Sequence, residues 1–131
     1  GVDHLITETL AAPDWLPAAT QGTIGIQCRA EDTEVMQLIE PLKDTDAVVR
    51  TLAERAVASA LQGSCQVPLA VFASINDDQM HISALVGMPD GSQLLRCEQV
   101  GAAAEWAQLS ALIAEELLEL GAGRIIASLA S

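Results

Sequence analysis

Hydrophobic and polar positions follow helical spacing most clearly in the last third of the chain. Over residues 103–120 apolar side chains recur every three or four positions, and Gly121 follows directly. This spacing places them on one face of a helix, and glycine most easily adopts the left-handed conformation that ends one. We therefore predict an amphipathic core helix over 103–120. Its apolar stripe consists of Trp106, Leu109, Ile113, Leu117 and Leu120.

A further helix and three strands are predicted earlier in the chain. The helix covers residues 46–61, where Asp44 or Thr45 can cap the first turn and Gly63 can end the last. The strands show apolar composition or an alternation of apolar and polar side chains, as a sheet with one buried face requires. Turn sequences rich in Asn, Asp, Pro and Gly separate them. The predicted strands are 68–75, 80–86 and 93–100.

The two ends of the chain are less regular. Residues 2–10 and 31–42 have helical spacing, and residues 23–28 have the composition of a strand. Residues 124–129 fit a strand or a last helical turn. The order helix, three meandering strands, helix predicts an α+β fold. We expect a small antiparallel three-stranded sheet with helices packed on one face, preceded by an incomplete strand–helix segment.

Charge and composition narrow the classes of partner. Among 131 residues there are 18 acidic and 6 basic side chains, which gives a formal net charge of −12. Binding to nucleic acid or to an anionic membrane needs clustered Lys and Arg, so neither partner is expected. Half of the chain is apolar, which is too much for a disordered acidic tail, yet no apolar run is long enough to span a membrane. The chain starts without a signal peptide, so we expect the interior of a longer gene product or a trimmed one.

Three cysteines, Cys28, Cys65 and Cys97, lie far apart in the sequence. An odd count without Cys-x-x-Cys spacing argues against a disulfide framework and favours reduced thiols in a cytoplasmic protein. The two histidines, His4 and His81, have no nearby metal-ligating partner, so no metal site is expected.

Cys65 is the candidate functional thiol. It follows the predicted helix 46–61 and stands beside two small residues, Gly63 and Ser64, which leave room for a bulky group to approach the backbone. The C-terminal end of a helix is negative, which argues against a thiol with a lowered pKa that turns over in each cycle. The position suits a thiol that reacts once with a strong electrophile and stays capped. The alternative is a structural cysteine in a stand-alone α+β ligand-binding or interaction module.

Several segments together resemble the porphobilinogen deaminase family, also called hydroxymethylbilane synthase. The resemblance covers nearly the whole chain, and its cysteine motif is specific. The matching segments are Glu54-Arg55, Leu61-Gln62-Gly63-Ser64-Cys65-Gln66-Val67-Pro68-Leu69-Ala70, Leu16-Pro17-Ala18 with Gln21-Gly22, Ile24-Gly25-Ile26-Gln27-Cys28-Arg29, and Val86-Gly87-Met88-Pro89-Asp90-Gly91-Ser92.

The resemblance implies a covalent cofactor and a reaction in tetrapyrrole (heme) biosynthesis. The matching Cys65 would hold a dipyrromethane cofactor through a thioether, with Gly63 and Ser64 beside it. The family is a transferase that joins four porphobilinogen units to this primer, with loss of ammonia at each step, and releases linear hydroxymethylbilane. Gln21 and Gly22 match the segment that reaches the active-site cleft, so the resemblance makes them cofactor-binding candidates.

Three neighbours of these motifs have smaller expected roles. Thr20 stands where the family usually has Gly, which affects the local backbone geometry. Glu54 is expected to brace its helix and the hinge rather than to act as an acid. Arg55 is expected to lie on a solvated helix face.

The resemblance also implies a division into domains. Residues 1–22 would end the second domain of the family enzyme, residues 23–44 would be a strand–helix segment of the first domain plus a hinge, and residues 45–131 would be the cofactor-attachment domain. The catalytic aspartate and the basic cluster of the family would lie on upstream domains. We therefore expect no catalytic residue in this chain and no activity from it alone. Its partners would be porphobilinogen, linear polypyrroles and those N-terminal domains.

Overall fold

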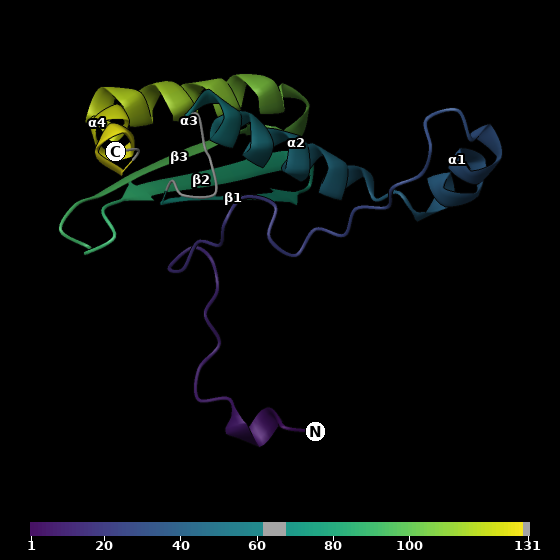
Figure 1. The fold of residues 1–131 in the computed structure, drawn as a ribbon, viewed down its shortest axis with the longest axis horizontal. Coiled ribbons are helices and arrows are strands. Elements are labelled where there is room, and N and C mark those ends of the chain that lie inside the picture. The colour runs from purple at the N-terminus through teal and green to yellow at the C-terminus, as the bar shows by residue number, and fades with distance from the viewer. Residues whose placement is uncertain (62–67, 130–131) are drawn as a thin grey trace.

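A computed structural model of the chain describes residues 1–61 and 68–129. A three-stranded sheet lies under the last three α-helices, and most of the N-terminal 44 residues extend away from it (Figure 1), whereas the segment 17–20 lies against β1 and α2. Three of the elements are short 3₁₀ turns, labelled η. In chain order the elements are η1 (Asp3–Leu5), α1 (Thr33–Ile39), η2 (Glu40–Leu42), α2 (Thr45–Ala60), β1 (Leu69–Asn76), β2 (Gln79–Gly87), β3 (Leu94–Ala102), η3 (Ala103–Glu105), α3 (Trp106–Leu120) and α4 (Ala122–Leu129).

The sheet is an antiparallel meander in the order β1-β2-β3. Asp77 and Asp78 form the tight turn between β1 and β2, and both have positive φ, 49° and 60°. Asp and Asn tolerate this conformation better than most residues, which explains why a two-residue hairpin forms at this sequence. At the other end of the sheet, Met88 N–H donates to the carbonyl oxygen of Gln93 at 2.8 Å and closes the β2–β3 connection.

The hydrophobic core lies between one face of the sheet and the helices α2, α3 and α4. Alternation along β2 decides which face is covered: Ile82 and Ala84 are fully buried, whereas His81 and Leu85 point to the opposite face and are half-exposed. The predicted α+β fold, with helices on one face of a small antiparallel sheet, is confirmed. The largest fully buried side chains include Leu61, Met80, Ile82, Ile113 and Leu117.

Local sequence signals set the helix ends. Asp44 caps α2, because its side chain accepts a hydrogen bond from Ala47 N–H at 2.9 Å. Gly121 ends α3 with a left-handed φ of 105°. Residues 124–129, for which the sequence left strand and helix open, belong to the helix α4, which begins at Ala122, and its Ile125 is buried in the core. Leu120, expected in the core stripe of α3, is half-exposed.

Two expectations for the N-terminal part are wrong. Residues 23–28 form no strand, and Ile24 and Ile26 are 90% and 55% exposed. A strand needs a neighbour to accept its backbone hydrogen bonds, and no other strand of the described residues lies beside this segment. Within residues 2–10 only the short turn η1 is helical. The predicted helix over 31–42 forms as α1 followed by η2, with the change of helix type next to Pro41.

Candidate functional site

Cys65, Gly63 and Ser64 lie outside the described residues. The structure therefore shows only the residues that border this segment, Leu61 before it and Pro68 after it. Leu61 is 2% exposed and belongs to the core, and the carbonyl oxygen of Pro68 accepts a hydrogen bond from Gly87 N–H at 3.1 Å. Both flanking residues are thus fixed to the compact part of the molecule, one through packing and one through the sheet.

The other two cysteines differ in their surroundings. Cys97 on β3 is 3% exposed, and burial, followed by the negative charge of Glu116 on α3, raises the pKa of its thiol to about 11. Since the thiolate is the reactive form, Cys97 is a poor nucleophile at neutral pH. Cys28 is half-buried and lies in the irregular segment before α1. Neither thiol is fully exposed.

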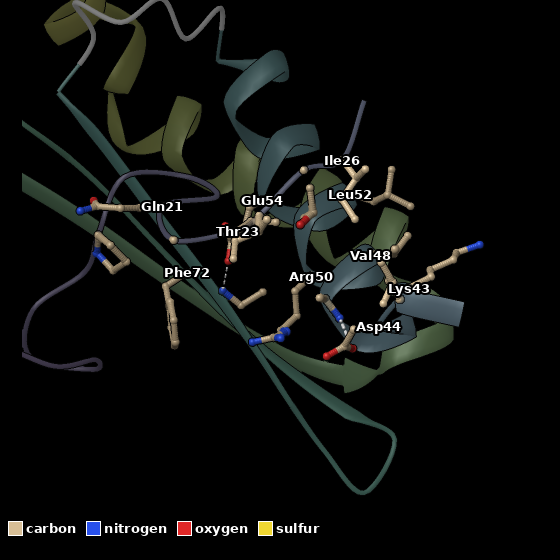
Figure 2. A pocket seen from close by; sticks show the side chains of 18 of the residues that line it. Gln21, Thr23, Ile26, Lys43, Asp44, Val48, Arg50, Leu52, Glu54 and Phe72 are labelled. Carbon is tan, nitrogen blue, oxygen red and sulfur yellow. Dashed lines mark hydrogen bonds between the residues drawn. The ribbon is translucent and has the colours of Figure 1, made fainter. Parts of the chain in front are cut away.

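A half-open cleft of about 770 Å³ lies between the N-terminal half of α2, the segment 17–26 and β1. Figure 2 shows its labelled side chains spread along α2, from Gln21 at one end to Lys43 and Asp44 at the other. Gln21 and Gly22 line this cleft, as do Glu54 and Phe72. Leu61 and Pro68 are not among its lining residues. Gln21 and Gly22 thus both lie at the cleft. That they contact a cofactor attached to Cys65 stays a prediction.

The turn that carries Gln21 and Gly22 has an unusual backbone. Thr20 and Gly22 both have positive φ, 61° and 85°. Thr23 N–H donates to the carbonyl oxygen of Thr20 at 3.1 Å, and the Gln21 side-chain oxygen accepts from Ala18 N–H at 3.2 Å. A Cβ added at Gly22 would meet nothing within 4 Å. The turn therefore leaves open space beside the Gly22 backbone and leaves the NH₂ group of Gln21 on the surface.

Glu54 connects this turn to the rest of the fold. Its carboxylate is buried, with 7% of the residue exposed, and accepts hydrogen bonds from Thr20 N–H at 2.6 Å and from Ala73 N–H at 2.8 Å. Glu54 thus ties its helix to β1 and to the turn before the cleft, while its expected role at the hinge stays a prediction. Arg55, the next residue, is exposed as expected. Only the motif Glu-Arg identified Glu54 in the sequence; its two backbone partners had no sequence signal.

The charges that line the cleft are mixed, with an acidic excess. Lys43 and Arg50 are its basic residues, and Glu40, Asp44 and Glu54 are its acidic ones. Lys43 is paired with Glu40 at 3.4 Å. Such a lining does not favour a ligand that carries several carboxylates, because the cations are outnumbered and one of them already has a partner.

A cluster of charged side chains lies on the face of the sheet that the helices leave open. The Glu98 carboxylate lies 2.6 Å from Nη2 of Arg96 and 3.4 Å from Nε2 of His81. The hydrogen bond from Arg96 is the main cause that lowers the pKa of the Glu98 carboxyl. These side chains are about 35–43% exposed, so the Arg96–Glu98 ion pair and the neighbouring His81 are solvated. His81 itself lies at the surface, on the side of β2 opposite to the core.

Residues 1–61 and 68–129 contain neither a cluster of metal-ligating side chains nor a membrane-spanning helix. No group of three or more His, Cys, Asp or Glu side chains in these residues is arranged to hold a metal ion. None of the helices in the described parts has the length and apolar composition needed to cross a membrane.

Comparison with known protein families identifies the family of the compact part of the chain. The family model of the porphobilinogen deaminase C-terminal domain matches residues 48–119, which is more than half of the chain. The matched region runs from the first turn of α2 to the end of α3 and contains all three strands. It also contains the motif around Cys65. This chain belongs to the porphobilinogen deaminase family and carries its C-terminal domain.

Proposed function

We propose that the chain is the cofactor-carrying, C-terminal part of a hydroxymethylbilane synthase of tetrapyrrole biosynthesis, with the cofactor attached to Cys65. The observation that carries this proposal is the family match over residues 48–119, which surrounds the cysteine motif. In the complete enzyme a dipyrromethane on Cys65 supplies the primer onto which four porphobilinogen units are joined with loss of ammonia.

The described residues suit a cofactor held through Cys65. The burial and the raised pKa of the Cys97 thiol disfavour it as the attachment point and so support Cys65. Leu61 and Pro68 are anchored to the core and to the sheet, so the domain offers a fixed base on both sides of the attachment motif. Gly22 has open space beside its backbone, and the Gln21 amide can donate from the surface of the cleft. Their contact with a pyrrole ring is part of the proposal.

The division into domains is also proposed. Every fully buried side chain of the described residues lies at or beyond Ala53, and no residue of 1–44 is fully buried. This boundary supports residues 45–131 as the attachment domain. Residues 1–22 and 23–44 are then the parts that belong with the second and first domains of the enzyme.

The chain does not catalyse the reaction by itself under this proposal. Porphobilinogen and the growing polypyrrole carry carboxylates, whereas the chain has a net charge of −12 and its cleft has more acidic than basic side chains. The cations that bind the substrate are therefore assigned to the upstream domains, which are the proposed partners of this chain.

Intact-protein mass spectrometry of the enzyme produced with its full native chain tests the attachment. The protein is expected to carry a mass increment of two pyrrole units, and Cys65→Ala is expected to lose both the increment and the activity. Cys28→Ala and Cys97→Ala are the matched controls and should keep both. Absence of the increment, or activity that survives in Cys65→Ala, would leave the alternative of an α+β binding module with a structural cysteine.

The 131-residue chain provides a second test. Incubated with porphobilinogen, it is expected to form no linear bilane. Formation of bilane by the chain alone would contradict the assignment of substrate binding and catalysis to upstream domains.

A further inference from the structure

The carboxylate of Glu54 joins three separate segments of the chain. Glu54 lies on α2, its Oε1 accepts from Ala73 N–H on β1, and its Oε2 accepts from Thr20 N–H in the turn before the cleft. In the described parts of the chain no Lys or Arg lies within ion-pair distance of it. Two backbone N–H groups therefore provide the hydrogen bonds that a buried carboxylate requires.

The same carboxylate accepts a hydrogen bond from the open edge of the sheet. β1 is an edge strand, because the strand order is β1-β2-β3. Two N–H groups on its open edge find partners outside the sheet: Val71 N–H donates to the carbonyl oxygen of Pro17 at 3.2 Å, and Ala73 N–H donates to Glu54. The segment from Pro17 to Thr20 is thus fastened at one end directly to β1 and at the other through Glu54.

The turn held in this way contains a residue with an unfavourable backbone conformation. Thr20 has a φ of 61°, and a side chain with a Cβ disfavours this left-handed conformation by about 1–2 kcal/mol. A short hydrogen bond to a buried carboxylate is among the stronger ones in proteins. The bond from Thr20 N–H to Glu54, at 2.6 Å, is therefore placed where it can compensate for the strain.

We infer that Glu54 is the positioning residue for Gln21 and Gly22, because it holds the Thr20–Gly22 turn at a fixed place on the edge of β1. The importance of those two residues for pyrrole binding rests on the proposed function; the hold on the turn does not. A carboxylate is required for this role, since both oxygens accept hydrogen bonds from different segments. The amide of Gln has the same shape but only one accepting oxygen.

Hydrogen exchange of the 131-residue chain, measured by NMR at single amides, tests the inference. In Glu54→Gln one of the two amides, Thr20 or Ala73, is expected to exchange about tenfold faster or more, since one hydrogen bond to a charged group is lost. In Glu54→Ala both should do so. Each rate is expressed relative to the Ile113 amide in the α3 core, so that a change in global stability cancels.

The matched control is Glu115→Gln, an exposed position on α3, which is expected to change neither amide. If Glu54 only filled space, the isosteric Glu54→Gln would also leave both amides unchanged, and that result overturns the inference. The outcome is independent of the cofactor: a protein without a pyrrole adduct would refute the proposed function while these exchange rates still decide the role of Glu54.

Discussion

Residues 1–44 and residues 45–129 both contain many apolar side chains, but the two regions bury them very differently. In the second region the apolar positions of α2, α3 and the sheet meet in one core. In the first region Ile24, Leu38 and Leu42 are 68–90% exposed, and no side chain is fully buried. A hydrophobic pattern in the sequence therefore defines the apolar face of a helix or strand, but that face is buried only where another element packs against it. In the proposed enzyme the partner of the first region is an upstream domain.

The two regions are joined at few places. Ala19 packs against the core, Pro17 bonds to the edge of β1, and Thr20 bonds to Glu54. The remaining residues before α2 depend on local hydrogen bonds such as the cap of α1 by Asp32. Matched substitutions in the two regions should therefore have unequal effects on the stability of the fold.

The largest difference is expected between two isoleucines. Ile113→Ala should lower the free energy of unfolding by about 3 kcal/mol, because this fully buried side chain leaves a cavity in the core. Ile24→Ala should change it by less than about 0.5 kcal/mol, since Ile24 is 90% exposed. Urea unfolding followed by circular dichroism measures both. Equal effects would mean that residues 1–44 share the core of the second region.

The buried thiol of Cys97 is expected to make the stability of the fold depend on pH above pH 9. Its pKa is raised to about 11, so the folded state keeps the proton that the unfolded chain releases near pH 9. The stability that this group contributes is full below pH 9 and is lost as the pH rises to 11, by up to about 2 kcal/mol. Unfolding at pH 8 and pH 10.5 should show the loss in the wild type and a smaller one in Cys97→Ala. A matching loss in that variant would assign the effect to other groups.

The N-terminal caps of α1 and α2 provide another pair of matched substitutions. Asp44 caps α2 through Ala47 N–H at 2.9 Å, and Asp32 caps α1 through Val35 N–H at 3.2 Å. Asp44→Ala should cost about 1 kcal/mol of global stability, because α2 belongs to the core. Asp32→Ala removes the same kind of bond from a helix without buried residues, so the unfolding midpoint should stay unchanged. A loss of the same size in both variants would contradict the separation of the regions.

The smallest effect concerns exposed ion pairs. Arg96→Ala should cost about 0.5 kcal/mol or less, and Arg29→Ala, which removes the pair with Asp32, still less. The hydrogen bond from Arg96 lowers the pKa of Glu98, so the contribution is present at neutral pH and is lost as the pH falls through that lowered pKa. Thermal unfolding at pH 7 and at pH 3 measures it; a cost for Arg96→Ala that is larger at pH 3 would contradict this sign.

The sequence predicted the second region well because its signals were local. The spacing of α3, the cap at Asp44 and the glycine at 121 each specify a structure with few neighbours involved. The strand expected at 23–28 failed because strand formation depends on a partner strand. Likewise, the cleft and the two bonds of Glu54 join segments 19 to 34 residues apart, and no spacing rule relates these. The family resemblance alone singled out Gln21 and Gly22, whereas the position of Cys65 beside two small residues had already marked that thiol as a candidate.

Peptide mapping of the native, full-length enzyme tests the central claim most directly. Trypsin cleaves after Lys and Arg, so the three cysteines fall on separate peptides: Cys28 on the peptide that ends at Arg29, Cys65 within 56–96 and Cys97 within 97–124. The account predicts that the mass of two pyrrole units lies on peptide 56–96, at Cys65, and that the other two cysteine peptides are unmodified. An adduct on another peptide, or unmodified Cys65 in active enzyme, would contradict it.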